Sequence, residues 1–429
     1  MKRESKQTEI GDIPFDWEVV SLGQISQRIK DKNDGAEHEI LTISAKTGFV
    51  RQADRYSRYM AGKSVENYTL LKQGEFSYNK GNSLTYPFGC IYRLDDYIQA
   101  LVPNVYISFR LIETINSEFF KHLFLEGTFI ARLKRYITSG VRGNGLLNVN
   151  SEDFFSLELA LPPLQEQQKI AEVLSALDEK LDVMDEQIAQ TQELKKGLMQ
   201  HLLTKGIGHT AFKESLLGEI PESWEVVRGE DISSLITKGA SPGWQGFDYT
   251  EKGLLFVTSE NVKDGRLDIS KPKFLPLGFN KKVAKSQLKN GDILLNIVGA
   301  SIGRTCIYES QYEFANVNQA VCVLRSNSKA LSGFLLHYLQ SPDTIKRLLG
   351  TQAGSARQNL SLSDIRAFMV ALPSLSEQRH IAEILATVDD KMQVLTDKKS
   401  KYQELKYGLM QQLFTGQHRV RVAAELATI

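Results

Sequence analysis

Residues 161–206 read LPPLQEQQKIAEVLSALDEKLDVMDEQIAQTQELKKGLMQHLLTKG, and residues 372–417 read LPSLSEQRHIAEILATVDDKMQVLTDKKSKYQELKYGLMQQLFTGQ. Aligned without a gap at an offset of 211, the two stretches are identical at 22 of 46 positions. Agreement at one fixed offset over this length indicates an internal repeat. The chain therefore carries the same long segment twice.

Both copies have a narrow apolar stripe with the alternating four- and three-residue spacing of a coiled-coil seam. The seam residues are Ile170, Leu174, Leu177, Leu181, Met184 and Ile188 in the first copy and Ile381, Leu385, Val388, Met392 and Leu395 in the second. The leucines that follow, at 194, 198 and 202 and at 405, 409 and 413, are one residue out of phase, which predicts a stutter.

A helix of about 42 residues is about 60 Å long, and so narrow a stripe needs a partner helix. The other copy can supply it, so we expect the two helices to pair as an antiparallel coiled coil within the chain. Gly197 and Gly408 lie inside these helices, where glycine is unfavourable by about 1 kcal/mol relative to alanine. They mark either a close approach of the two helices or a notch for another protein.

The segments between the helices are repeats too, although more diverged. GDIPxxWEVV at residues 11–20 returns as GEIPxxWEVV at 218–227, and the CIY of residues 90–92 returns at 306–308, in the same order. Trp17, Trp224, Cys90 and Cys306 are therefore expected in the core. The predicted domains are two target-recognition domains, two long helices and a tail, with the boundaries 1–160, 161–206, 207–371, 372–417 and 418–429.

Each globular segment consists mainly of short apolar runs between Gly, Asn and Asp, which is the pattern of strands and turns. Residues 119–136 and 334–349 have helical apolar spacing, so one helix is expected late in each segment. The predicted fold class is α+β: two tandem domains of mixed strands and short helices alternate with the two long helices. The whole chain is thus an internal pseudo-two-fold repeat.

Composition excludes several classes of protein. The chain has 429 residues, 42% of them hydrophobic, and a net charge of only +1, so any surface for nucleic acid must be local. No apolar run approaches the ~20 residues of a membrane span, and the N-terminus lacks the apolar centre of a signal peptide. Three cysteines and seven histidines show no spacing for a disulfide framework or a metal. We expect a cytoplasmic protein without a metal site.

Two recognition-sized domains on paired helices imitate a two-fold dimer in one chain. Dimeric DNA-binding proteins use two-fold symmetry to contact two half-sites. Because the two domains have diverged, their half-sites can differ, and the helices would act as a spacer between them.

The sequence resembles the specificity subunit of type I restriction-modification enzymes over nearly its whole length. The resemblance rests on LPPLxEQxxIA from residue 161 and GLMQ at 197–200, with both returning from residues 372 and 408. The second domain adds KGASP at 238–242 and GDIL at 291–294, followed by Gly299 and Gly303. The first domain departs from this pattern: the KGASP turn is missing, and the glycine pair becomes the looser Gly81 and Gly89.

The resemblance implies a non-catalytic, DNA-binding subunit of a restriction system. Each target-recognition domain would read one half of an asymmetric bipartite sequence in double-stranded DNA. The helices would dock two modification subunits, which transfer a methyl group from S-adenosylmethionine to adenine N6. The resemblance also allows a translocating restriction subunit as a further partner, and the sequence does not decide whether one joins. No cofactor is expected on this chain itself.

Side chains suited to DNA contact are concentrated in loops. Residues 263–289 carry eight lysines and arginines against Asp264 and Asp268, which suits phosphate contact, although a solvated face is the plainer interpretation. Asn, Gln and Arg can present paired groups to base edges. The candidates are Asn79, Lys80, Asn82, Tyr86, Arg142, Asn144, Lys238, Ser241, Trp244, Gln245, Tyr249, Lys263, Lys281, Lys282, Lys285, Asn296, Ser301, Arg304, Arg357 and Gln358.

Two other functions are less consistent with the sequence. A self-contained DNA methyltransferase or nuclease is disfavoured, because the only Pro-Pro pair stands at a helix start and no GxxxxGK[ST] phosphate loop is present. A coiled-coil interaction scaffold would explain the helices but gives no reason for two diverged, loop-rich domains between them.

Overall fold

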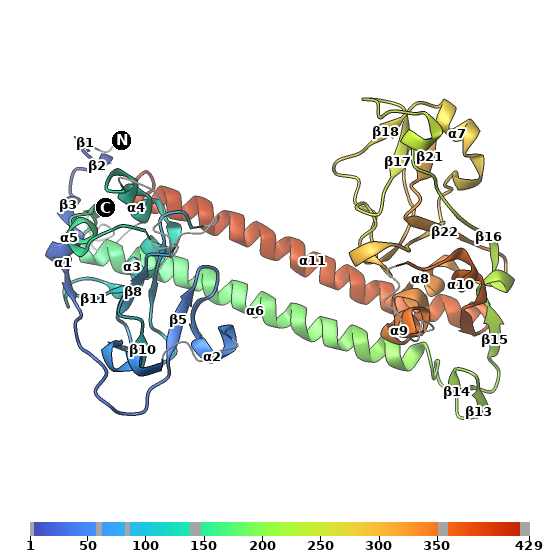
Figure 1. The fold of residues 1–429 in the computed structure, drawn as a ribbon, viewed down its shortest axis with the longest axis horizontal. Helices are drawn as coiled ribbons and strands as arrows, with labels where there is room; N and C mark the ends of the chain where they lie inside the picture. Colours follow the sequence, from blue (N-terminus) through green and yellow to red (C-terminus); the bar gives the residue numbers. More distant parts are fainter. Residues whose placement is uncertain (1–3, 57–61, 82–85, 138–146, 351–358, 421–429) are drawn as a thin grey trace, which may run out of the picture. The chain divides into compact units, whose positions relative to one another are not determined.

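The computed structural model describes residues 4–56, 62–81, 86–137, 147–350 and 359–420. The chain forms two compact units. Unit 1 comprises Met1–Val183 and Lys398–Ile429, and unit 2 comprises Met184–Asp397. Each unit contains a recognition domain, part of the long helix α6 (Leu164–Leu202) and part of the long helix α11 (Leu375–Phe414) (Figure 1). This confirms the predicted α+β class with two tandem domains and two long helices.

The base of unit 1 is a four-stranded antiparallel sheet that packs against helices. Its strand order is β4 (Ser26–Arg28), β11 (Ile107–Leu111), β8 (Phe76–Asn79) and β9 (Cys90–Arg93). The core under it joins Phe76 and Phe109 of the sheet to Phe120 and Phe124 of α3 (Ser117–Glu126) and to Leu174 of α6. The sheet is thus buried directly against the long helix that follows the domain.

Smaller elements complete this base. A hairpin and a second strand pair hold the chain entry beside the start of α6, and three short helices fill the edges. Their bounds are β1 (Ser5–Thr8), β2 (Gly11–Pro14), β3 (Glu18–Ser21), β12 (Glu158–Leu161), α1 (Leu22–Ile25), α4 (Thr128–Ala131) and α5 (Ser151–Phe155).

Unit 1 also has an outer lobe with a core of its own. Two antiparallel pairs, β5–β6 and β7–β10, are linked by a parallel bridge between Ile40 and Leu101. Their side chains, including Leu41, Leu71 and Val102, form a cluster with Cys90 of β9 that is distinct from the main core of the base. The bounds are β5 (Leu41–Ser44), β6 (Gly48–Arg51), α2 (Gln52–Arg55), β7 (Thr69–Lys72) and β10 (Gln99–Val102).

Unit 2 repeats the base of unit 1 strand for strand. Its four-stranded sheet has the order β16 (Ser233–Lys238), β22 (Val321–Ser326), β19 (Ile293–Asn296) and β20 (Thr305–Ile307). The hairpin β13–β14 and the pair β15–β23 stand where β1–β2 and β3–β12 stand in unit 1. The bounds of the remaining base elements are β13 (Phe212–Ser215), β14 (Gly218–Pro221), β15 (Glu225–Arg228), α8 (Ser332–Gln340), α9 (Pro342–Gly350), α10 (Leu362–Ala367) and β23 (Met369–Leu372).

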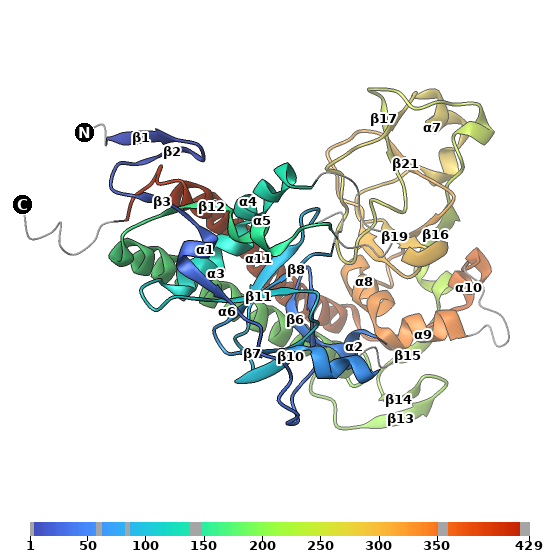
Figure 2. The ribbon, with the colours of Figure 1, turned by 60° about the vertical axis from the view of Figure 1, so that its left-hand side comes forward.

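The outer lobe of unit 2 has a full parallel strand pair where unit 1 has only the parallel bridge between Ile40 and Leu101. It is a three-stranded sheet in the order β18 (Phe274–Leu275), β17 (Leu254–Val257) and β21 (Ala315–Val317), with β17 and β21 parallel. Helix α7 (Gly278–Lys282) covers it through Phe279, which is buried with Phe256 and Leu275. In both views this lobe stands away from α8, α9 and α10 of the base (Figures 1 and 2).

Each helix predicted late in a domain is broken in the structure. In unit 1, α3 ends at Gly127, whose φ of 91° is accessible to glycine at no steric cost, and α4 starts after it. In unit 2, α8 ends before Pro342, because the residue preceding a proline is disfavoured in helical conformation. Helical spacing of apolar residues continues across both breaks, so periodicity alone joined two helices into one.

The long helices are antiparallel. In unit 1 the start of α6 shares a core with the end of α11, through Ile170 and Leu174 with Met410 and Leu413. In unit 2 the end of α6 shares a core with the start of α11, in which Ile381 and Leu385 are fully buried. The other predicted seam residues are buried or half-buried: Leu177, Leu181, Met184, Ile188, Val388, Met392 and Leu395.

The predicted stutter is wrong. Leu194 and Leu405 are 53% and 51% exposed, whereas Thr191 is buried and Lys195 faces an aspartate of the other helix. The seam therefore keeps its four-three spacing through polar residues that an apolar pattern does not register. Close helix approach at the two helical glycines is also wrong, because a Cβ on Gly197 or Gly408 would meet no atom within 4 Å.

Candidate nucleic-acid interface

The base of unit 1 is fastened to α6 by one buried carboxylate. Glu166 is 1% exposed and accepts a hydrogen bond from the indole Nε1 of Trp17 at 2.9 Å. Arg419, which follows α11, donates to both oxygens of Glu166 at 2.5 and 2.7 Å and to both oxygens of Asp16 at 2.9 and 2.7 Å. The hydrogen bond from Arg419 holds the pKa of Asp16 below its ordinary value.

The equivalent carboxylate of unit 2 has a histidine in place of the arginine. Glu377 accepts from Nε1 of Trp224 at 3.0 Å and lies 2.8 Å from Nε2 of His209, which follows α6. The backbone N–H of Ile207 donates at 3.0 Å to Oε1 of Glu377, the oxygen that also faces His209. The expectation that both tryptophans are core residues is confirmed, and the Glu of the repeated EQ pair is the partner of each.

The glutamine of the EQ pair ties a second point of each domain to its helix. Gln167 accepts from the backbone N–H of Asn116, the N-cap of α3, at 3.0 Å and donates to the carbonyl of Pro162. In unit 2, Gln378 accepts from the backbone N–H of Leu331 at 2.8 Å and donates to the carbonyl of Pro373. Both glutamines are buried, so losing either partner would leave unsatisfied polar groups in the interior.

A buried histidine lies at the junction of each domain with both helices. His122 of α3 has Nδ1 3.6 Å from Asp178 of α6, which is paired with Lys406 of α11. In unit 2, His337 of α8 lies 3.8 Å from Asp389 of α11, which pairs with Lys195 of α6 at 2.6 Å. Burial lowers the pKa of each histidine to about 4, so both are neutral at pH 7.

Sequence reasoning passed over these junction residues. They are Glu166, Gln167, Glu377, Gln378, Arg419, His209 and the two His–Asp–Lys sets. Most are polar residues that recur at an offset of 211, as with Asp178 and Asp389 or Lys195 and Lys406. Identity between the copies at polar positions was the available signal, because apolar periodicity explains only the other positions.

The outer lobe of unit 2 presents most of the predicted DNA-contact residues described for that unit. Trp244 is 92% exposed, and Tyr249 is 55% exposed. Lys281 and Lys282 end helix α7 and Lys285 follows it, and all three are exposed. Lys238, at the end of β16, is exposed as well, whereas Ser241, Gln245 and Lys263 are half-buried. One lobe therefore carries both a basic surface and exposed aromatic side chains.

The structure corrects the expectation for Asn296. Its side chain is fully buried, and its amide donates to the carbonyl of Ser259 at 2.9 Å and to the hydroxyl of Ser301 at 3.1 Å. Ser301 is thereby engaged too, whereas Arg304 is exposed. Asn296 therefore fixes the turn after β19 and cannot reach a base edge as the loop stands.

Asn79 occupies the equivalent place in unit 1. Its amide donates to the carbonyl of Ile43 at 3.2 Å, and its oxygen accepts from the backbone N–H of Gly81 at 2.9 Å. Lys80 donates to the carbonyl of Val149 at 3.1 Å, and Tyr86 packs against the outer-lobe core. These three residues support the loop around them. The remaining predicted residues, Asn82, Arg142, Asn144, Arg357 and Gln358, lie outside the described part of the chain.

The cysteines have no chemical role that the geometry supports. Cys90 and Cys306 are buried in β9 and β20, as expected. Burial raises the pKa of the Cys90 thiol to about 11 and that of Cys306 to about 12, so both stay protonated and unreactive at pH 7. Among the described residues no group of three His, Cys, Asp or Glu side chains is placed to hold a metal ion.

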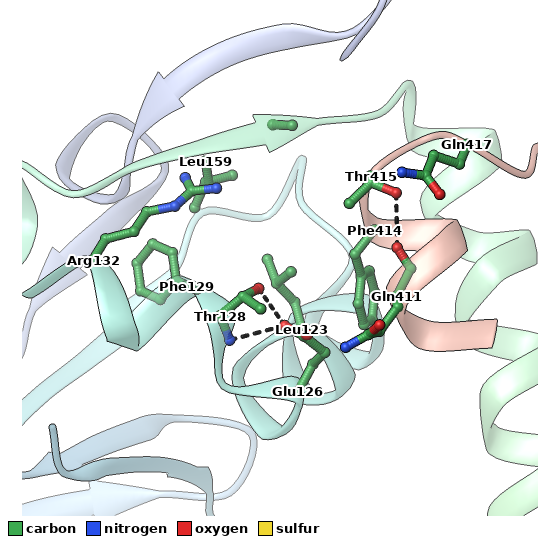
Figure 3. A pocket seen from close by; sticks show the side chains of 11 residues that line it. Leu123, Glu126, Thr128, Phe129, Arg132, Leu159, Gln411, Phe414, Thr415 and Gln417 are labelled. Carbon is green, nitrogen blue, oxygen red and sulfur yellow. Dashed lines mark hydrogen bonds between the residues drawn. The ribbon is translucent and has the colours of Figure 1, made fainter. Parts of the chain in front are cut away.

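Each unit has a crevice beside the end of a long helix. In unit 1 it measures about 290 Å³ and lies between Phe129, Arg132 and Phe414, where the Thr415 hydroxyl donates to the Gln411 carbonyl at 2.7 Å (Figure 3). In unit 2 the counterparts Arg347, Leu203 and Thr204 line a larger, mainly apolar crevice of about 1060 Å³. Both crevices belong to the repeated base and not to the outer lobes. No helix in the described ranges is both long and apolar enough to cross a membrane.

Comparison with known proteins agrees with this architecture. The model of the type I restriction modification DNA specificity domain matches residues 14–193 and again residues 221–405. The type I restriction enzyme MjaVIII specificity subunit of Methanocaldococcus jannaschii is 30% identical over 296 residues, which cover 67% of this chain and 68% of that protein. The putative MjaX specificity subunit of the same organism is 28% identical over 436 residues and 97% of both chains.

Solved structures show the same fold. A chain from a structure of type I restriction-modification complex assembly has a TM-score of 0.56 at 16% identity, covering 95% of this chain and 99% of that one. The type I restriction-modification S subunit of M. genitalium has a TM-score of 0.54 at 16% identity, covering 93% and 96%. With two copies of the family's domain matched along most of its length, this chain belongs to the family of type I restriction-modification DNA specificity subunits.

Proposed function

We propose that each unit of this chain reads one half of an asymmetric bipartite DNA target, with the outer lobes supplying the reading surfaces. The observation that carries the proposal is the contrast within the units. Their bases repeat strand order, the Trp–Glu contact and the His–Asp–Lys contact, whereas their outer lobes differ in the extent of strand pairing and in the side chains that they expose. A repeated base with diverged lobes suits one docking geometry combined with two sequence preferences.

The basic surface of the unit 2 lobe supports DNA contact. Its lysines lie on a chain of net charge +1, so the positive charge is concentrated locally. Of the nearby acids, Glu260 is paired with Lys273 at 2.9 Å. Phosphate neutralisation by such residues supplies salt-dependent affinity, and base-edge contacts then supply specificity.

The chain is proposed to act without catalysis of its own, as a subunit of a complex. Specificity subunits of this family bind DNA and assemble with other subunits. The proposed partners are two methyltransferase subunits that use S-adenosylmethionine, joined by a restriction subunit in the complete enzyme. The helices, continuous over 39 and 40 residues, would set the spacing between the half-sites. An interaction scaffold without DNA reading leaves the family's DNA specificity domains unexplained.

An exposed helical surface supports docking of two partners. Leu194 and Gly197 of α6 are exposed on one face, and the equivalent Leu405 of α11, close to Gly408, is also exposed. An open glycine beside an exposed leucine forms a shallow notch for an apolar side chain. Leu194→Asp and Leu405→Asp should each remove one methyltransferase copy, measured by native mass spectrometry. Two copies retained in either variant would place docking elsewhere.

The experiment that tests the reading function is a domain exchange. Residues 1–160 would be replaced by the equivalent segment of another specificity subunit, and methylated adenines would be mapped in DNA modified by the complex. One half of the target should change while the other half and the spacing stay the same. A change in both halves would show that the units do not read independently.

A further inference from the structure

An exposed tryptophan on the outer lobe of unit 2 has no structural role in the fold. Trp244 is 92% exposed, while Trp17 and Trp224 are fully buried. An indole is a large apolar group that proteins rarely leave in water. No equivalent of Trp244 exists in unit 1, so the repeated base does not require it.

The turn that carries Trp244 is held rigidly. Pro242 precedes a short 3₁₀ turn, Gly243–Gln245, and its carbonyl accepts from the backbone N–H groups of Gln245 at 2.9 Å and Phe247 at 3.0 Å. Nζ of Lys282 donates to the carbonyl of Gln245 at 2.8 Å. The indole is therefore presented by a fixed backbone, so little main-chain entropy would be lost when it is buried by a ligand.

The turn also rests on a buried aromatic cluster. The ring of Phe247, just after the turn, meets Phe279 edge to face with centroids 5.5 Å apart, and Phe279 meets Phe256 in the same way at 5.6 Å. Both Phe279 and Phe256 are fully buried. The turn that carries the indole is thus supported by the packed core of the lobe.

Positive charge lies beside the indole. Lys282 is in contact with the turn itself, and Lys281 and Lys285 are exposed on the adjoining helical segment. An exposed aromatic ring beside several lysines fits a polyanion whose interior offers flat apolar surfaces, which is the chemistry of stacked DNA bases. A protein partner would be matched by an apolar surround, which these lysines do not provide.

We propose that Trp244 is a wedge that enters the DNA bound by unit 2 and stacks against a base at an opened base step. This inference rests on the proposed DNA-reading function and assigns to Trp244 a positioning role. Apolar wedges of this kind partly unstack a step and bend the duplex, and flexible pyrimidine–purine steps open at the lowest energy. Trp244 would therefore select for deformability at a step of the unit 2 half-site.

The full chain offers a direct probe, because Trp244 is its one exposed tryptophan among three. Duplex DNA carrying the target mapped by methylation should quench the tryptophan fluorescence of the wild type, and the Trp244→Phe variant should lose that change. 2-Aminopurine placed along the unit 2 half-site should brighten at one step with the wild type and with Trp244→Phe, but not with Trp244→Ala.

Binding constants complete the test. Trp244→Ala should lose about 5- to 150-fold in affinity for the target, the range of one base–aromatic stack, while Trp244→Phe keeps most of it. Leu216→Ala is the matched control, because it removes an 82% exposed apolar side chain at the hairpin end of the same unit and should leave affinity unchanged.

The outcomes are distinguishable. Specific DNA binding without quenching, or with full affinity in Trp244→Ala, would overturn the wedge and leave the reading function intact. Quenching by a methyltransferase subunit in the absence of DNA would overturn it in favour of a protein contact. A wild-type chain that binds no DNA in its modification complex would overturn the reading function as well.

Discussion

Unit 1 and unit 2 share a tryptophan–glutamate contact, but the third residue that joins the contact differs between them. In both, a buried glutamate accepts a hydrogen bond from a tryptophan, but the added partner is Arg419 in unit 1 and His209 in unit 2. Arg419 is a permanent cation with four hydrogen bonds to two carboxylates, whereas His209 makes one. The tryptophan–glutamate hydrogen bond is thus the same in both units, whereas the number of hydrogen bonds from the third residue differs.

A second comparison, between base and outer lobe, explains why that geometry is preserved. Each base is joined to both long helices, by the Trp–Glu contact at one point and by the His–Asp–Lys contact at another. The outer-lobe clusters share residues with the base sheets, such as Cys90 of β9 and Leu294 of β19, but contain no residue of either long helix. A lobe can therefore change its sheet and loops without shifting the base on its helix.

The largest expected effect comes from removing the glutamate that binds the buried tryptophan of each unit. Glu166→Ala leaves Arg419 and the indole N–H of Trp17 without their buried partner, which should cost about 3 to 5 kcal/mol of unfolding free energy. Glu377→Ala should cost less, because His209 makes one hydrogen bond to Glu377 where Arg419 makes two to Glu166. Urea unfolding of the two variants measures the difference. Equal losses would mean that the choice of arginine or histidine has no effect on stability and would contradict the comparison between the units.

Acid should destabilise both units through their buried histidines. The folded-state pKa of His122 and His337 is lowered to about 4, below the ordinary value of about 6.5, so the unfolded chain takes up protons that the folded chain does not. Stability is therefore full above about pH 6.5 and falls as the pH drops toward 4, by up to about 3 kcal/mol per histidine.

Urea unfolding between pH 7 and pH 4.5 tests this expectation, and the His122→Gln/His337→Gln variant is the control. Its stability should fall less steeply with pH, since glutamine does not titrate. A single substitution would show which unit unfolds first in acid. If the double variant follows the wild-type pH curve, carboxylates and not these histidines control the acid response.

The lobe lysines give the smallest change in free energy. Replacing Lys281, Lys282 and Lys285 with alanine should weaken DNA binding about 10- to 100-fold at low salt for all sequences and reduce the salt slope by up to about 3. Lys329→Ala/Lys346→Ala/Lys391→Ala removes the same charge from exposed positions on the base and helix of unit 2. Gel shifts at several salt concentrations compare the two variants, and equal weakening would contradict a lobe-specific interface.

Much of the fold followed from the repeat, because apolar residues at helical spacing and recurring tryptophans specify packing locally. The predicted seam is wrong where the observed seam becomes polar. Thr191 and Lys195 belong to the observed seam, while Leu194 faces solvent. A lysine joins a seam only if its partner, here Asp389, lies opposite on the other helix. That partner is almost two hundred residues away, so no local pattern reveals it.

The sequence by itself determined the duplication, the two long helices, the buried tryptophans and the family. These depend on identity between copies and on periodicities that the backbone imposes. Only the tertiary structure decided that Asn296, at the end of β19, is buried while Trp244 is exposed, although glycines lie close to both in the sequence. It also decided that Glu166 meets Arg419 across some 250 positions. Whether a polar group is buried, and what it pairs with, depends on which residues the rest of the chain places beside it. The packing of the lobes depends on the tertiary structure in the same way.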